Sequence, residues 1–163
     1  MADSYSIPAT TRIGHVHLKV SNLERALQFY HGVLGFEIIQ RLGDEAAFIS
    51  AGGYHHHIGL NTWQSKGASA PPQYSTGLFH TAIVYPTRKD LAQILKRLLD
   101  NGIKLTGAAD HGVSEALYLN DPDENGVELY WDRPREDWPK AEDGSIEMYT
   151  RALNLNNLLE ELN

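Results

Sequence analysis

The sequence predicts an α+β fold in which a βαβββ unit occurs twice, and three observations lead to this prediction. A strand, a helix and further strands follow one another in the same order in residues 12–63 and 77–132. The strands are rich in β-branched and aromatic residues, whereas the helices carry apolar residues at helical spacing. A histidine lies near the start of the first strand in both units, at His15 and at His80. We therefore expect two modules that pair into a curled mixed sheet and enclose a metal-binding cleft.

The first unit begins with a strand over residues 13–20, IGHVHLKV, which is rich in β-branched side chains. Ser21 and Asn22 offer an N-cap for a helix whose apolar residues keep helical spacing as far as Leu34. Gly32 and Gly35 are then expected to close that helix. Three further strands, separated by turns that contain glycine, are expected at FEIIQRL, AAFIS and YHHHIGLNTW.

The second unit repeats this plan, beginning with the strand FHTAIVYP. Thr87 is the expected N-cap of a helix with the sequence DLAQILKRLLDNG. This helix ends at Gly102, a residue type that suits the left-handed conformation at a helix C-terminus. The remaining strands are expected at IKLT, EALYLN and GVELYWD, with the turn DPDENG between the last two.

A linker and a tail complete the chain. Residues 64–76 are rich in Ser, Gly, Pro and Ala and predict a linker or mobile loop. Residues 133–163 form a polar tail, interrupted by proline, that ends in the short amphipathic helix NLNNLLEELN. We expect residues 1–163 to form a single domain, because 163 residues with 42% hydrophobic content can build one sizeable core.

Composition excludes several classes of function. A formal net charge of −7 without a Lys/Arg cluster argues against nucleic-acid binding. The absence of cysteine excludes disulfides, thiolate metal sites and cysteine nucleophiles. The N-terminal residues MADSYSIPATTR have neither the apolar core nor the basic start of a signal peptide, and no apolar run reaches the length of a membrane span. We therefore expect a soluble, cytoplasmic domain.

His15, His80 and Glu128 carry the strongest indication of chemistry. Each lies near the same end of a strand-like segment, and the pseudo-twofold repeat would bring the two histidines to equivalent places on facing strands. Two imidazoles and one carboxylate can bind one face of a metal ion and leave the other face open, as in non-haem Fe(II) oxygenases. A lone histidine at a strand start is usually structural, so the prediction depends on the matched positions of both histidines together with Glu128.

At these residues the chain resembles the vicinal oxygen chelate superfamily, and within it the type I extradiol catechol-2,3-dioxygenases. Four stretches, which cover about four fifths of the sequence, carry the resemblance: GHVHLKVSNLERALQFYHGVLGFE, AGGYHHHIGLNTW, GLFHTAIVYPTRKDL and HGVSEALYLNDPDENGVELYWDRP. The resemblance implies paired βαβββ modules, and His15, His80 and Glu128 as ligands of Fe(II), with Mn(II) as an alternative ion. It also implies a small aromatic diol and O2 as substrates.

Two departures from the wider superfamily shape the expectation. In glyoxalases the first unit usually supplies a fourth ligand, often Glu, at the position equivalent to Glu128. Aligning Gly53 with Gly126 places that position in the run 54–57, where no carboxylate is available, and this favours a three-ligand dioxygenase site. Well-known extradiol enzymes carry two module pairs, whereas this chain has one pair. A homodimer or higher homo-oligomer is therefore expected to close the cleft.

The resemblance also implies residues that act beside the metal. His56 is the candidate acid/base, with His55 or His57 taking the role if the register slips by one; strand alternation would put these two on the face opposite His56. His111 resembles the histidine that hydrogen-bonds a substrate oxygen, and Tyr118 the tyrosine that positions the substrate. His17 shares a face with His15, but the family register selects His15.

Three functions follow as alternatives. The first is an Fe(II)-dependent extradiol dioxygenase that acts on catechol or a substituted catechol. The second is a glyoxalase-like isomerase or lyase that uses the ion only as a Lewis acid. The third is a small-molecule binding or resistance protein without chemistry, which the presence of a metal triad disfavours. No nucleic-acid or membrane partner is expected.

Overall fold

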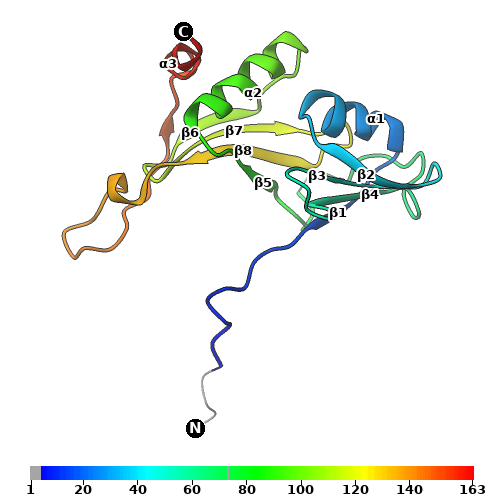
Figure 1. The fold of residues 1–163 in the computed structure, drawn as a ribbon, viewed down its shortest axis with the longest axis horizontal. Helices are drawn as coiled ribbons and strands as arrows, with labels where there is room; N and C mark the ends of the chain where they lie inside the picture. Colours follow the sequence, from blue (N-terminus) through cyan, green and yellow to red (C-terminus); the bar gives the residue numbers. More distant parts are fainter. Residues whose placement is uncertain (1–4, 73) are drawn as a thin grey trace.

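Two mixed β-sheets, each with a helix beside it, make up the computed structural model of the chain, which describes residues 5–72 and 74–163 (Figure 1). The first sheet has four strands and the second has five. In Figure 1 both main helices lie on the same side of the molecule, and the N-terminal segment extends away from the opposite side. The predicted α+β class is confirmed.

The first sheet has the strand order β1-β4-β3-β2, with β1 and β4 parallel and the other pairs antiparallel. Its strands are β1 Val16–Lys19, β2 Glu37–Leu42, β3 Ala46–Ser50 and β4 Ile58–Asn61. Between β1 and β2 the chain forms α1, Leu23–Leu27, which continues as the π-helical turn η1, Gln28–Val33. The side chain of Asn22 accepts a hydrogen bond from the backbone of Arg25, as expected of an N-cap.

The second sheet repeats this order as β5-β8-β7-β6 and adds β9 at its far edge. Its strands are β5 Thr81–Val84, β6 Gly107–Asp110, β7 Ser114–Asn120, β8 Gly126–Asp132 and β9 Arg151–Ala152. The helix α2, Arg88–Asp100, begins at a capping box between Thr87 and Asp90 and is followed by Gly102 at φ +68°. The same strand order and the same parallel pairing in both sheets confirm the predicted repeat.

One expected strand is absent, and another begins later than expected. Residues 103–106 lie outside the strands, and β6 begins only at Gly107. Residues 54–57 precede β4 and contain bends at His55 and His57, so the alternation expected for the three histidines does not apply. In both cases β-branched or aromatic residues occur where the chain is still turning, and composition alone does not locate the first ladder hydrogen bond.

The core lies between the helices and the sheets as one continuous cluster that draws on both units. Leu91, Leu95 and Leu98 on α2 are fully buried, as is Leu60 on β4. Each such side chain contributes roughly 1.5–3 kcal/mol by leaving water. The tail belongs to the same core, because Leu158 of the helix α3, Leu155–Leu159, is also fully buried. The short helices η2, Arg135–Asp137, and η3, Glu160–Leu162, complete the tail.

Polar contacts fix how the two units sit against each other. Tyr30 at the end of the first helix donates a buried hydrogen bond of 3.0 Å to Asp121 in the turn between β7 and β8. Arg25 forms an ion pair of 2.6 Å with Asp123 in the same turn. Because Tyr30 is only 1% exposed, breaking this contact would leave its buried hydroxyl without a partner, which is costly. The relative orientation of the units is therefore set by contacts within one chain.

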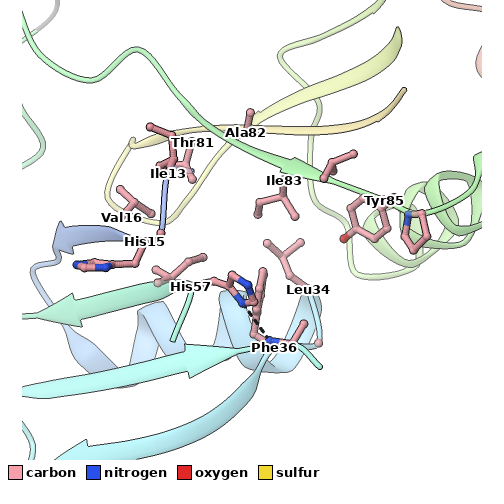
Figure 2. A pocket seen from close by; sticks show the side chains of 16 residues that line it. Ile13, His15, Val16, Leu34, Phe36, His57, Thr81, Ala82, Ile83 and Tyr85 are labelled. Carbon is pink, nitrogen blue, oxygen red and sulfur yellow. Dashed lines mark hydrogen bonds between the residues drawn. The ribbon is translucent and has the colours of Figure 1, made fainter. Parts of the chain in front are cut away.

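The two sheets do not join into one. The first strands, β1 and β5, each lie at the edge of their own sheet, and each pairs only with the last strand of its unit among the described residues. A pocket of about 490 Å³ lies between these edges, lined by residues on both sides of it (Figure 2). Among the described residues, no helix is long and apolar enough to cross a membrane.

Candidate metal centre

His80 and Glu128 meet in the second unit. His80 immediately precedes β5, and the parallel pairing of β5 with β8 sets Ala82 opposite Glu128. The Nε2 atom of His80 lies 2.9 Å from Oε2 of Glu128. Gly126 permits this approach, because a Cβ atom at that position would lie 2.1 Å from the carbonyl oxygen of Phe79 and 3.1 Å from Cβ of His80. Two of the predicted ligands are thus in contact.

Tyr118 supports the carboxylate from the neighbouring strand. It lies directly opposite Glu128 in the β7–β8 pairing, so both side chains share a face of the sheet. Its hydroxyl donates to Oε1 of Glu128 at 2.9 Å. Burial, together with the hydrogen bond and negative charge of Glu128, raises the pKa of Tyr118 to about 12. The phenol therefore remains a donor at neutral pH and orients the carboxylate.

His111 extends this chain of contacts by one residue. Its Nε2 atom lies 2.7 Å from the Tyr118 hydroxyl. The turn that carries it is held by Asp110, which accepts from the backbone of Gly112 and forms an ion pair of 2.6 Å with Arg133. That guanidinium lowers the pKa of Asp110 below its usual value, so the ion pair persists at neutral pH. His80, Glu128, Tyr118 and His111 thus form one continuous series of contacts, in which hydrogen bonds link Glu128 to Tyr118 and Tyr118 to His111.

A pocket of about 400 Å³ lies beside this series. His80 and Tyr118 line it together with Phe79 and Asn120. Its volume is within the range of sites that bind small molecules. A ligand in this pocket would lie next to the His80 imidazole and the Tyr118 ring.

His15 lies in the first unit, apart from the other two predicted ligands. Its ring is 4.4 Å from that of His56, centroid to centroid. Figure 2 shows the imidazole directed away from Ile83 and Tyr85 on the β5 side of the pocket. Within residues 5–72 and 74–163, no three His, Cys, Asp or Glu side chains are close enough to share a metal ion. The expectation that one chain gathers His15, His80 and Glu128 is therefore not met, because the two sheets do not close on each other.

The three consecutive histidines 55–57 have different surroundings. Nδ1 of His56 lies 2.7 Å from Nδ1 of His55, whereas Nδ1 of His57 lies 2.9 Å from the Ser50 hydroxyl. The expected placement of His55 on the face opposite His56 is wrong, because these residues lie in a bend. Desolvation and the neighbouring imidazoles, His15 first among them, lower the pKa of His56 below its usual value. His56 is thus the histidine of the run that adjoins His15.

The first unit has no carboxylate at the position equivalent to Glu128. In the parallel pairing of β1 with β4, His17 lies opposite Gly59, as Ala82 lies opposite Glu128 in the second unit. The equivalent of Glu128 is therefore Gly59, and the expectation that it falls in residues 54–57 is wrong. A Cβ atom on Gly59 would lie 2.8 Å from the His17 ring, so this ring covers the place of a fourth ligand.

By the same comparison Phe48 occupies the position of Tyr118. Phe48 lies opposite Gly59 in the β3–β4 pairing, as Tyr118 lies opposite Glu128. Sequence reasoning missed this pair because it aligned glycines in turns. An alignment of Ile58 with Val127, the apolar residues that pair with the first strands, would have revealed it.

Comparisons with known proteins identify the family of this chain. Residues 12–129 match the family model described as the Glyoxalase/Bleomycin resistance protein/Dioxygenase superfamily. The chain is 44% identical over 157 residues to a catechol-2,3-dioxygenase of Bacillus subtilis (strain 168), which covers 96% of this chain and 54% of that protein. It is 33% identical to biphenyl-2,3-diol 1,2-dioxygenase 3 of Rhodococcus globerulus, over 76% of this chain and 64% of the relative. The chain thus spans about half to two thirds of the length of these relatives.

Solved structures show the same fold. A glyoxalase/dioxygenase from Nostoc punctiforme superposes with a TM-score of 0.66 at 16% sequence identity, over 82% of this chain and 100% of the other. A lactoylglutathione lyase from Agrobacterium tumefaciens superposes with a TM-score of 0.60 at 19% identity, over 76% of this chain and 96% of the other. At this level of identity the likeness concerns the fold alone.

Proposed function

The chain belongs to the glyoxalase/bleomycin resistance protein/dioxygenase superfamily, and from this premise we propose that it is an Fe(II)-dependent extradiol dioxygenase that cleaves catechol or a substituted catechol with O2. The observation that carries the proposal is the contact of His80 with Glu128, backed by Tyr118 and His111. Similarity to a catechol-2,3-dioxygenase and to biphenyl-2,3-diol dioxygenases supports the choice of substrate class.

The residues present fit a divalent metal ion. Two neighbouring ligands at about 2.1 Å from an octahedral ion lie about 3 Å apart. The separation of 2.9 Å between Nε2 of His80 and Oε2 of Glu128 is close to that value, so both atoms suit one ion without rearrangement. One imidazole nitrogen and one carboxylate oxygen suit Fe(II), and the same donors accept Mn(II).

We propose that His15 of a second copy supplies the third ligand. Within one chain, closing the sheets on each other would disturb the buried Tyr30–Asp121 bond and the Arg25–Asp123 ion pair. Both first strands offer open edges for such a contact. Apolar side chains beside these edges are largely exposed in the single chain, with Ile13 at 96% and Phe79 at 89% exposure. A homodimer would bury these residues and complete two equivalent centres.

When bound, Fe(II) would hold the diol and O2 on its open face and transfer electron density between them. Tyr118 holds the Glu128 carboxylate in place through its hydrogen bond. His56, which adjoins His15, would enter the centre with it. Its lowered pKa keeps the ring neutral at pH 7, the form that accepts a proton from the diol and returns it later.

The deciding experiment is anaerobic reconstitution with Fe(II), followed by aerobic mixing with a small panel of catechols. We expect stoichiometric O2 consumption together with a yellow ring-cleavage product. Metal binding without O2 consumption would instead favour a Lewis-acid isomerase or lyase. Ligand binding without any bound metal would favour a binding protein.

Mixing two inactive variants tests whether the centre is shared between copies. His15→Ala and Glu128→Ala are each expected to be inactive alone. In a co-refolded equal mixture, half of the dimers combine both variants and have one intact centre of two, which restores about a quarter of wild-type activity. No recovery, together with active wild-type protein, would place the three ligands in one chain.

The absence of a carboxylate at Gly59 disfavours the glyoxalase-like alternative. The first unit offers no fourth ligand at that position, and the His17 ring covers it. An open-faced three-ligand centre leaves room for two diol oxygens and O2. A Lewis-acid isomerase, by contrast, has no need of an O2 site.

A further inference from the structure

A short segment of the tail lies directly against the turn that carries His111. The strand β9 pairs with β6, with Arg151 opposite Asp110. Just before β9, the backbone N–H of Tyr149 donates to the carbonyl oxygen of His111 at 3.3 Å. The segment 149–152 therefore runs antiparallel to residues 109–111, and its atoms reach the imidazole of His111.

Two groups of this segment lie beside Nδ1 of His111. The carbonyl oxygen of Tyr149 is 3.0 Å away, and the hydroxyl of Thr150 is 3.3 Å away. A carbonyl oxygen can only accept a hydrogen bond, whereas a hydroxyl can also donate one. The same ring nitrogen thus has one partner for its protonated form and another for its unprotonated form.

The opposite side of the ring fixes which nitrogen carries a hydrogen. An ionised Glu128 only accepts, so the single hydroxyl hydrogen of Tyr118 is committed to it. The Tyr118 oxygen can then only accept from His111, whose Nε2 atom is 2.7 Å away. Nε2 therefore carries a hydrogen in both charge states, and Nδ1 is the nitrogen whose protonation changes.

We propose that the Tyr149 carbonyl and the Thr150 hydroxyl are positioning groups that hold His111 against Tyr118 in both protonation states. When the ring is charged, Nδ1–H donates to the Tyr149 carbonyl; when it is neutral, Nδ1 accepts from the Thr150 hydroxyl. Gaining or losing a proton then leaves the contact with Tyr118, and hence the support of Glu128, unchanged. The part that these groups would play in catalysis rests on the proposed dioxygenase function.

The segment is firmly held in this position. The ring of Tyr149 packs on Gly112, where a Cβ atom would lie 2.8 Å from its Cε1 atom. The guanidinium of Arg151 lies 4.0 Å from the centre of the same ring, a cation–π contact. Beyond β9, Glu161 forms an ion pair of 2.7 Å with Arg88 at the start of α2. The tail is thus anchored on both sides of Thr150.

Charged and titratable groups approach His111 from each element that packs against it. From the sheet come Tyr118 on β7, which contacts His111 directly, and Glu128 on β8, which contacts Tyr118. Asp110 and its partner Arg133 lie at the turn that carries His111, and Tyr149 and Arg151 come from the tail. A change confined to the uncharged Thr150 leaves all of these groups in place, so its effect on the protonation of His111 is readily interpreted.

Thr150→Val removes the hydroxyl and keeps the shape of the side chain. The neutral ring then loses its donor, whereas the charged ring keeps the Tyr149 carbonyl, so the titration midpoint of His111 should rise by about half to one pH unit. We would measure it by 15N NMR of the histidine rings in the Zn(II)-loaded protein, with His111→Gln to assign the signal. The limb of the pH–rate profile for catechol turnover that follows the protonation of His111 should likewise move to higher pH.

Two matched variants complete the test. Thr150→Ser should restore the wild-type midpoint, and Thr76→Val, at an exposed threonine of the linker, should leave it unchanged. An unchanged midpoint in Thr150→Val would overturn the proposal. If the wild-type Fe(II) protein fails to consume O2 with catechols, the dioxygenase function fails, and the NMR midpoint still decides whether Thr150 and Tyr149 hold His111.

Discussion

The two units share a strand order and a pairing register, yet they differ in the side chains at equivalent positions. His15 and His80 occupy equivalent places, but Glu128 corresponds to Gly59 and Tyr118 corresponds to Phe48. The second unit therefore holds a carboxylate that a phenol supports. The first unit has no carboxylate at that place, and the His17 ring occupies it.

This difference would make the proposed centre asymmetric, although the two units share one plan. A symmetric pair of units with both carboxylates would offer four ligands to one ion. With glycine at position 59, the proposed centre would have three ligands, and the remaining face of the ion would be open to substrate. In the proposed centre, the first unit would contribute through His15 and its neighbour His56.

Removal of the carboxylate from the second unit should have the largest effect. Glu128→Ala deletes a ligand and leaves the Tyr118 hydroxyl without its acceptor, so we expect Fe(II) affinity to fall more than about 100-fold and turnover to be lost. Metal content after dialysis and O2 consumption would measure this. Glu37→Ala, at an exposed carboxylate on β2, is the control and should behave as wild type. Full turnover in Glu128→Ala would refute the ligand assignment.

Replacement of the acid/base candidate of the first unit should spare the metal and slow the reaction. His56→Phe keeps an aromatic ring beside His15 but removes both nitrogens, so we expect normal Fe(II) content and a loss of about 100-fold or more in kcat. His55→Phe is the matched control at the adjacent position and should lose little. Normal turnover in His56→Phe, or a larger loss in His55→Phe, would move the role to another residue.

An exchange at the equivalent positions Tyr118 and Phe48 tests the asymmetry directly. Tyr118→Phe removes the donor to Glu128 and the link to His111, so we expect a loss of about 10-fold in Fe(II) affinity. Phe48→Tyr adds a hydroxyl that faces Gly59 and therefore finds no carboxylate, so no gain is expected. Metal titration and kcat of both variants would measure this. Equal effects of the two changes would show that the units contribute alike.

The repeat and most elements could be predicted from the sequence, because caps, apolar spacing and glycine turns are local signals. The N-caps Asn22 and Thr87 were found in this way, as was the positive φ of Gly102. The strand β9 could not be predicted, since two residues, Arg151 and Ala152, join the sheet only through pairing with β6. A pattern two residues long carries no periodicity.

The sequence predicts which residues belong to the candidate site, but it does not predict which of them lie together in space. His80, Glu128, Tyr118 and His111 meet because strand pairing within one unit brings them together. The position of His15 depends on how the two units pack, which is set by contacts such as Tyr30 with Asp121. Such contacts between distant polar residues have no signature in a single sequence.

A side chain added at Gly59, where the first unit lacks a carboxylate, should have the smallest effect on activity but a measurable effect on stability. In Gly59→Ala the added Cβ would lie 2.8 Å from the His17 ring, which must move, so we expect a loss of about 1–3 kcal/mol in the free energy of unfolding. Denaturant unfolding would measure it. In the double variant with His17→Ala the clash is absent, so most of the added cost of Gly59→Ala should disappear. If the stability losses of Gly59→Ala and His17→Ala simply add, the His17 ring does not fill the place of the fourth ligand. The difference between the two units would then originate outside these two residues.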